Sequence, residues 1–245
     1  MHSILILIAL LAGEASASPY YRFWQGWKLD KLSAAEFQRG LEETLIPRTI
    51  DVGAKKGLIA YLPWLVSKPD GRPDEIALVI YLSEAEYKAI RETPEGKEYG
   101  ELHWTLFDKD RGSKSAVTEP FKGVLEVSHA YDVLQSNADW QKGYAVVELT
   151  RVKANPEPFV KYLGRGAAAK GLQSYVVLRG DGYVVEYQLW RSKFAFERSR
   201  GQILRVKERY LETLPGFSAI TRKSSAHGSA IRLGEALNTQ FGVTP

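Results

Sequence analysis

The sequence predicts an α+β protein in which one strand-helix-strand-strand-helix-strand unit is used twice. Short apolar runs alternate with amphipathic segments from Tyr20 to His129, and the same alternation recurs from Gly143 to Arg222. A second observation is that serine followed three residues later by glutamate, a signal for the start of a helix, precedes two amphipathic segments of the first unit. Two such units must bury two sheets, so the chain is expected to form one structure with a shared core.

In the first unit, apolar runs mark the strands and capping signals mark the helices. Strands that are apolar on both faces are expected where helices cover one side of a sheet and a second sheet covers the other. The expected elements are a strand over Tyr20–Lys28, a helix that starts after Ser33 and Glu36 and ends near Pro47, strands over Leu58–Val66 and Glu75–Leu82, a helical region from Ser83 to Trp104 that restarts at Thr93-Pro94, and a strand over Phe121–His129.

The second unit is more compact and contains a hairpin signal, Gly180-Asp181-Gly182, between two apolar runs. The expected elements are a strand over Gly143–Val152, a helix from Asn155-Pro156 to about Gly171, strands over Ser174–Leu178 and Tyr183–Trp190, a helix over Phe194–Leu214, and a last strand over Phe217–Arg222.

Residues 1–17 have the composition of a signal peptide. The apolar run from Ile4 to Leu11 is short, and Ala15-Ser16-Ala17 supplies the small residues that a signal peptidase accepts. We therefore expect a periplasmic or extracellular protein, with an uncleaved anchor as the alternative, and no transmembrane helix in the mature chain. The expected divisions are a signal peptide at 1–17, units at 18–133 and 143–223, a linker at 134–142 and a tail at 224–245.

Composition excludes several classes of function. Removal of the leader takes away one carboxylate and no base, which leaves 33 basic residues against 28 acidic ones and a formal charge of +5. This balance is too weak for a nucleic-acid-binding protein. The absence of cysteine rules out disulfides, thiol nucleophiles and thiolate metal sites. With 44% hydrophobic residues, the chain has enough apolar material to be stabilised by its core alone.

Two β-α-β-β-α-β units in one chain resemble the dimeric α/β-barrel superfamily of ferredoxin-like proteins, here fused as a pseudo-dimer. The stretch Tyr87–Trp104 (YKAIRETPEGKEYGELHW) looks most like the second helix of such domains. The resemblance implies a pocket between sheet and helices, and either a monomer or a homodimer. Members include cofactor-independent monooxygenases, haem enzymes and proteins that bind small apolar ligands, so haem is a possible cofactor that nothing in the sequence requires.

Two histidines are candidate catalytic residues. His129 alternates with Leu125 and Val127, which predicts an imidazole that points into an apolar interior, although a histidine bonded at a strand end fits the pattern too. His103 lies one helical turn after Tyr99, where it would face the predicted pocket or simply pack against it.

Polar and aromatic residues on the predicted strands are further candidates. Glu148 and Glu186 each share a strand face with a second polar residue, and a buried carboxylate is costly unless it is paired or used, so both are candidate proton acceptors if those faces are buried. The candidate ligand-binding residues are Tyr61, Tyr81, Trp104, Tyr187 and Gln188.

Three functions remain open on these grounds. The first is an exported protein that binds a small apolar or aromatic ligand, and the second is a cofactor-independent or haem-linked oxidoreductase of the dimeric α/β-barrel type. The third is a non-catalytic envelope protein that binds an anionic polymer or partner through Arg198, Arg205 and Arg209, which share one helical side.

Overall fold

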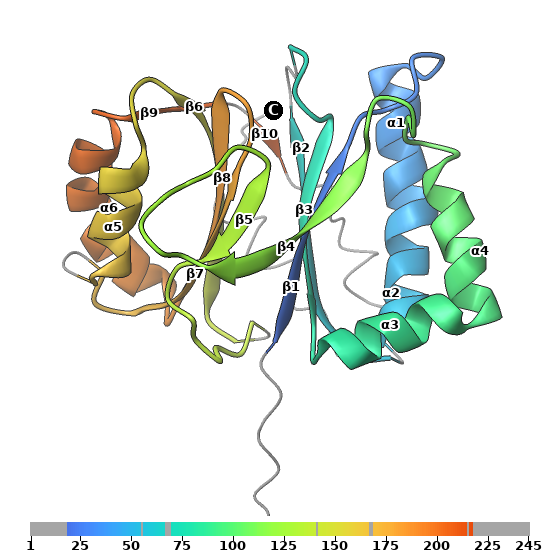
Figure 1. The fold of residues 1–245 in the computed structure, drawn as a ribbon, viewed down its shortest axis with the longest axis horizontal. Helices are drawn as coiled ribbons and strands as arrows, with labels where there is room; N and C mark the ends of the chain where they lie inside the picture. Colours follow the sequence, from blue (N-terminus) through green and yellow to red (C-terminus); the bar gives the residue numbers. More distant parts are fainter. Residues whose placement is uncertain are drawn as a thin grey trace, which may run out of the picture.

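The computed structural model describes residues 19–54, 56–66, 70–140, 142–166, 169–214 and 216–217. The predicted signal peptide and the predicted tail at 224–245 lie outside the described residues. Figure 1 shows the strands at the centre of the molecule, with α1 to α4 covering one outer side and α5 and α6 covering the other. The protein is therefore an α+β fold in which two sheet halves face each other and helices form the outer layers.

The elements follow the predicted order. The first half contains β1 (Tyr20–Gly26), α1 (Ala34–Gly40), the π-helical turn η1 (Leu41–Leu45), α2 (Ile46–Ala54), β2 (Leu58–Val66), β3 (Glu75–Tyr81), α3 (Glu84–Glu92), α4 (Pro94–His103) and β4 (Lys114–Pro120). The remainder contains β5 (His129–Asp132), β6 (Tyr144–Val152), α5 (Glu157–Gly164), β7 (Leu172–Arg179), β8 (Tyr183–Trp190), α6 (Lys193–Lys207), β9 (Leu211–Thr213) and β10 (Gly216–Phe217).

One curled ten-stranded sheet runs through both units, in the order β10-β2-β3-β1-β4-β5-β7-β8-β6-β9. The orders β2-β3-β1-β4 and β7-β8-β6-β9 are the same arrangement used twice, which confirms the ferredoxin-like repeat. Strand β5 joins the halves, because it pairs parallel with β4 and antiparallel with β7. The two outermost strands, β9 and β10, are separated in sequence only by Leu214 and Pro215, so the sheet must curl round until its edges come close together.

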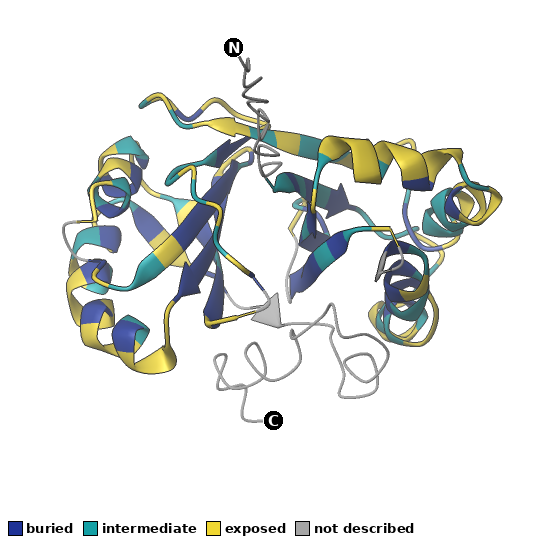
Figure 2. Cartoon of the chain, turned by 90° about the horizontal axis from the view of Figure 1, so that it is seen from below, coloured by how far each residue is buried: buried dark blue, intermediate teal, exposed yellow. Residues whose placement is uncertain are grey.

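The concave faces of the two halves pack on each other and form the central core. Tyr187 of β8 donates its hydroxyl to Leu62 O (3.0 Å) and Ile76 O (2.9 Å) of the first unit, and its ring packs edge-on against Phe23 at 5.4 Å. Tyr183 Oη donates to Gln25 Oε1 at 2.7 Å. In Figure 2 the strands at the centre of the molecule are mostly dark blue, the colour of buried residues. Tyrosines on one half thus satisfy buried polar groups on the other.

The first helix passes through Pro47 instead of ending there, so that prediction is wrong. In an uninterrupted α-helix, a proline would leave the carbonyl four residues earlier without its N–H partner. Here Ile46 N–H donates to Leu41 O, five residues back, and the π-helical turn Leu41–Leu45 shifts the hydrogen bonding just ahead of the proline. Helix α2 then continues to Ala54.

Three other boundaries also differ from the predictions. The strand expected over Phe121–His129 is wrong: β4 is the more polar segment Lys114–Pro120, and Val127, whose alternation with Leu125 and His129 suggested a strand, is exposed on a loop. The helix expected up to about Gly171 ends at Gly164, next to Gly166, whose φ of 64° interrupts a helix.

The last helix is shorter than the predicted Phe194–Leu214. It ends at Lys207, and Leu211–Thr213 leaves the helical axis to form β9 against β6. Of the predicted last strand, Phe217–Arg222, only Phe217 is among the described residues. It pairs with β2, together with Gly216, as β10. Within the predicted linker, Trp140 is buried and its Nε1 donates to Tyr21 Oη at 3.3 Å, so this segment packs on the first unit.

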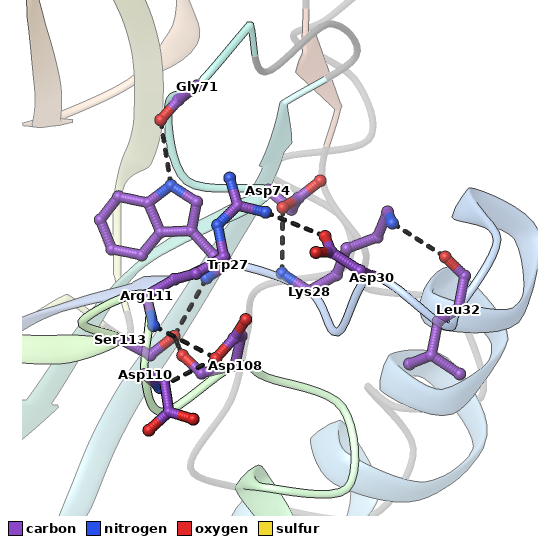
Figure 3. A network of polar contacts seen from close by, with 10 residues as sticks. All are labelled: Trp27, Lys28, Asp30, Leu32, Gly71, Asp74, Asp108, Asp110, Arg111 and Ser113. Atoms are coloured by element: carbon purple, nitrogen blue, oxygen red, sulfur yellow. Dashed lines mark hydrogen bonds and ion pairs between the residues drawn. The ribbon is translucent and has the colours of Figure 1, made fainter.

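One end of β1 is held by the polar network in Figure 3. Trp27 Nε1 donates to Gly71 O at 3.1 Å, and Lys28 N donates to Asp74 Oδ2 at 3.0 Å. Asp108 Oδ1 accepts hydrogen bonds from the backbone N–H groups of Asp110 at 2.8 Å and Arg111 at 3.1 Å, which is the geometry of a polar turn. These bonds fix the loops on either side of β1.

Two helical glycines give opposite stability predictions. A Cβ at Gly201 in α6 would meet no atom within 4 Å, so Gly201→Ala should raise the free energy of unfolding by about 0.5–1 kcal/mol through backbone entropy. A Cβ at Gly96 in α4 would collide with the Ile90 carbonyl, so Gly96→Ala should lower that free energy by about 1–3 kcal/mol. Urea unfolding of both variants tests the pair, and stabilisation by both would contradict the packing at Gly96.

Candidate functional site

A cavity of about 510 Å³ lies in the first unit, between the convex face of the sheet and helices α3 and α4. Strands β1, β2 and β3 form its floor. In the strand register Arg22 lies opposite Val79, and Val79 lies opposite Tyr61. These three residues therefore share one face of the sheet, and that face lines the cavity. The aromatic side chains of the lining are Trp24, Tyr61, Tyr81, Tyr87, Tyr99 and Trp104. The cavity is therefore suited to an aromatic or apolar molecule.

Glu75 is the carboxylate of this cavity. Its residue is completely buried, and Tyr61 Oη donates to its Oε1 at 2.7 Å, while Oε2 has no hydrogen-bond partner. Burial raises the pKa of Glu75 to about 7; the Tyr61 hydroxyl and the Trp24 indole oppose this rise. The Trp24 N–H lies near the carboxyl but completes no well-formed hydrogen bond. One oxygen of a buried acid is thus left available to a ligand.

His103 is held in the cavity wall by the end of α4. Its Nδ1 is 2.9 Å from Tyr99 O, and its ring packs against Trp24 with centroids 5.1 Å apart. Burial lowers the pKa of His103 to about 4, so the imidazole is neutral at physiological pH. A neutral imidazole whose Nδ1–H donates to a carbonyl keeps Nε2 as a hydrogen-bond acceptor.

Two arginines line the cavity near Tyr87. The Arg22 guanidinium stacks over the Tyr87 ring at 3.8 Å from its centroid, and Arg91 Nη1 donates to Tyr87 Oη at 3.1 Å. Both cations are therefore engaged with the same tyrosine. They give this part of the lining a positive character that the Glu75 part lacks.

The lining fits a haem poorly. A haem-ligating histidine must present a ring nitrogen to an open porphyrin plane. Around the His103 imidazole, the rings of Trp24, Tyr99, Trp104 and Phe107 lie with centroids 4.6–6.5 Å away, and a porphyrin would have to displace some of them. Within the described part of the chain there is also no cluster of three or more His, Asp or Glu residues suited to a metal ion.

In the second unit a buried ion-pair cluster lies between strands β6 and β8 and the end of helix α6. Lys207, which comes from the end of α6, lies 2.6 Å from Glu148 Oε2 and 2.7 Å from Glu186 Oε1. Tyr175 Oη donates to Glu186 Oε2 at 3.2 Å. Burial alone would lower the pKa of Lys207, but the two carboxylates outweigh it and the pKa is raised, so the side chain is an ammonium. Burial raises the pKa of Glu186.

The predicted site residues therefore separate into four places, the fourth of which is the surface position of His129. His103, Tyr61, Tyr81 and Trp104 line the cavity of the first unit. Glu148 and Glu186 meet in the cluster of the second unit, where Gln188 bonds to Glu186 at 3.3 Å. Tyr187 faces the central core.

His129 lies at the surface and does not face the apolar interior that its spacing suggested. Its side chain is 48% exposed and bonds to Glu119 at 3.0 Å. Arg198 and Arg205 of α6 are also exposed, as is Arg209, which follows the end of that helix.

Sequence reasoning missed Glu75, Arg22 and Trp24. Glu75 opens an apolar strand, a position where a glutamate is normally solvated. The signal that could have found it is Tyr61, a tyrosine on the strand that the hairpin places beside it. Arg22 and Trp24 alternate on β1 and so share one face, but the aromatic segment around them gave no indication of which face was covered.

No family model and no curated protein matches the chain. Among solved structures, a predicted monooxygenase of Fusobacterium nucleatum subsp. nucleatum is 10% identical, with a TM-score of 0.45, and the match covers 82% of this chain and 94% of that one. An anthrone oxidase-like protein is 14% identical, with a TM-score of 0.37 and coverage of 85% and 96%. A variant of the chlorite dismutase of Candidatus Nitrospira defluvii is 13% identical, with a TM-score of 0.34 and coverage of 85% and 94%. At these values the comparisons identify no activity.

Proposed function

We propose that this protein binds a small aromatic molecule in the cavity of its first unit. The observation that carries the proposal is the combination of an aromatic-lined space of about 510 Å³ with one fully buried carboxylate whose Oε2 has no partner. The aromatic walls would bury the apolar body of the ligand, and Glu75 would fix the orientation of its polar group. Of the three functions open from the sequence, an interaction protein needs no such space.

Export is part of the proposal but rests only on the leader. Residues 1–17 and their cleavage site lie outside the described residues, and a periplasmic or extracellular location stays a prediction. Among the described residues, no helix is both long and apolar enough to cross a membrane.

Filling the cavity should abolish binding without unfolding the protein. Val79 lies on β3 and lines the cavity, so Val79→Phe places a larger ring in the space that the ligand would occupy. We expect at least a tenfold loss of affinity for naphthylmethanol, a neutral aromatic probe, in isothermal titration calorimetry. Val117→Phe is the matched control, because Val117 is 47% exposed on β4 and is not part of the cavity lining. Absence of probe binding to the wild type, or equal binding by both variants, would contradict the proposal.

A second candidate function is a cofactor-independent oxidoreductase of the dimeric α/β-barrel type. The specific observation in its favour is that Glu75 has a pKa of about 7, which suits a group that removes a proton from a bound phenol near neutral pH. His103, which is neutral and lines the same cavity, would accept a hydrogen bond from the substrate. Oxygen consumption in the presence of a hydroquinone, measured for wild type and Glu75→Gln, tests this candidate. Consumption unchanged by the substitution would eliminate it.

A further inference from the structure

The described structure provides no counter-charge for Glu75. Its Oε2 is buried and without a partner, and no lysine, arginine or histidine in the described residues forms an ion pair with it. An unpaired carboxylate in an apolar site is costly, because its charge loses hydration without gaining a compensating charge. Protonation removes this cost, but a counter-charge for the ionised form has to come from a bound molecule.

The side chains that face Glu75 are all neutral. They are Tyr61 from β2, Trp24 from β1 and Tyr99 from α4. Burial raises the pKa of each of these tyrosines far above its usual value, and His103 in the same cavity is neutral as well. The cavity around the carboxylate therefore consists of aromatic rings, which attract cations through their π faces.

The second unit shows how the same arrangement is satisfied inside this fold. A register shift at Leu58/Ala60 in β2 recurs at Leu172/Ser174 in β7, which makes Tyr61 the counterpart of Tyr175. Both tyrosines donate to a buried carboxylate on the neighbouring strand of the same hairpin, Glu75 in one unit and Glu186 in the other.

The two carboxylates do not occupy equivalent positions, because Glu186 corresponds in register to Ala77, two residues beyond Glu75 on the same strand face. At Glu186 the missing charge is supplied by the Lys207 ammonium at 2.7 Å. The same ammonium lies 5.8 Å from the centroid of the Phe159 ring. In the second unit, an ammonium therefore lies between the buried carboxylate of Glu186 and the aromatic ring of Phe159.

We infer that the molecule bound in the first unit is an aromatic amine with a protonated, aliphatic ammonium group that pairs with Glu75. This inference rests on the proposed function, since it names the chemical class of that ligand. The carboxylate supplies the charge, and the rings of Trp24, Tyr61 and Tyr99 supply the surrounding π faces.

The arginines of the cavity favour one orientation of such a ligand. On β1, Gly26 lies opposite Glu75. Arg22 is four residues from Gly26, so the backbone positions of Arg22 and Gly26 are about 13 Å apart along the strand. Arg22 and Arg91 repel an ammonium from their part of the cavity, so the positive group is directed to Glu75 and the aromatic body lies towards Tyr87.

Three probes with the same aromatic body separate charge from shape. Naphthylmethylamine is a cation, naphthylmethanol is neutral and naphthoate is an anion at pH 8. Isothermal titration calorimetry should give the amine at least a tenfold lower Kd than the alcohol, with naphthoate the weakest ligand. In Glu75→Gln the amine should lose this advantage, while the alcohol should bind within about threefold of its wild-type affinity.

The pH dependence gives an independent readout. Between pH 6 and 8 the ionised fraction of Glu75 rises, so the association constant of the amine should rise roughly tenfold while that of the alcohol does not. The tyrosines and His103 do not change charge in this range. The other charged residues of the lining are Arg22, Arg91, Lys97, Glu98 and Glu101. Their contribution is removed by the same titration of Glu75→Gln, which should be flat.

The outcomes distinguish the two proposals. Binding of the alcohol as tightly as the amine, or an amine preference that persists in Glu75→Gln, would overturn the ammonium inference and leave the aromatic cavity intact as a binding site. Failure of all three probes to bind the wild type would overturn the proposed function, and the ammonium inference with it.

Discussion

Replacement of Lys207 by methionine is expected to lower the free energy of unfolding by about 3–5 kcal/mol at pH 7. The methionine has a similar length and is apolar, so the loss comes from charge and not from volume. Lys207 is 2% exposed and Glu186 is completely buried, and without the ammonium both Glu148 and Glu186 would be left without a counter-charge. Urea-induced unfolding followed by circular dichroism measures the difference.

Two further variants identify the cause. Adding Glu148→Gln and Glu186→Gln to Lys207→Met should restore most of the lost stability, because no buried charge then remains. Lys193→Met is the surface control: Lys193 pairs with Glu197 at 3.7 Å, both side chains are 55% exposed, and its loss should change the free energy of unfolding by less than about 0.5 kcal/mol. A small effect of Lys207→Met, similar to the control, would show that the cluster is hydrated and not buried.

The second large effect is a gain in stability. Glu75→Gln should stabilise the ligand-free protein by up to about 3 kcal/mol at pH 8, and by almost nothing at pH 4. The sign follows from a pKa that is about 7 in the folded state against 4.5 for an ordinary glutamate. The wild type has its full stability below pH 4.5 and loses this contribution as the pH rises through 7, whereas glutamine does not titrate.

The measurement is the free energy of unfolding of both proteins at pH 4, 6 and 8. A difference that does not change with pH would mean that Glu75 keeps an ordinary pKa in the folded state. Glu98→Gln serves as the control, since Glu98 lines the same cavity but is 74% exposed and paired with Arg48 at 3.2 Å. Its effect on stability should be small at every pH. A protein that becomes more stable when a buried carboxylate is removed retains that group for binding or chemistry.

Local signals in the sequence predicted the centre of each unit well. The strands β2, β3, β7 and β8 are predominantly apolar runs joined by turn residues, and Ser33 and Ser83 cap their helices as expected. These features depend on neighbouring residues only.

The edges of the sheet were not predictable in the same way. Strand β4 is largely polar and β9 is three residues long, so neither shows the apolar alternation of a strand. Both form strands because their backbones hydrogen-bond to a neighbouring strand, β1 for β4 and β6 for β9.

In the candidate site, too, residues marked by local spacing were predicted, and residues whose burial depends on distant parts of the chain were missed. The spacing in α4 predicted that His103 would face the pocket, and strand alternation predicted that Glu148 and Glu186 would lie on faces with other polar groups. Lys207, which joins the two glutamates, is 59 residues from Glu148 on a helix rich in surface bases, and nothing nearby in the sequence marks it as buried. Glu75 was missed for a related reason, because its burial depends on helices α3 and α4 covering the start of β3.

The pairing of Gly216 with Val66 has a consequence for the order in which the molecule assembles. Strand β10 is synthesised about 150 residues after β2, and forming a contact at that separation carries a large loop-closure entropy. Until the C-terminal segment arrives, the outer edge of β2 remains an open template with the apolar sequence LIAYLPWLV. Docking of β10 is therefore expected among the late events of folding, and a nascent or truncated chain that lacks it is the form most prone to aggregation.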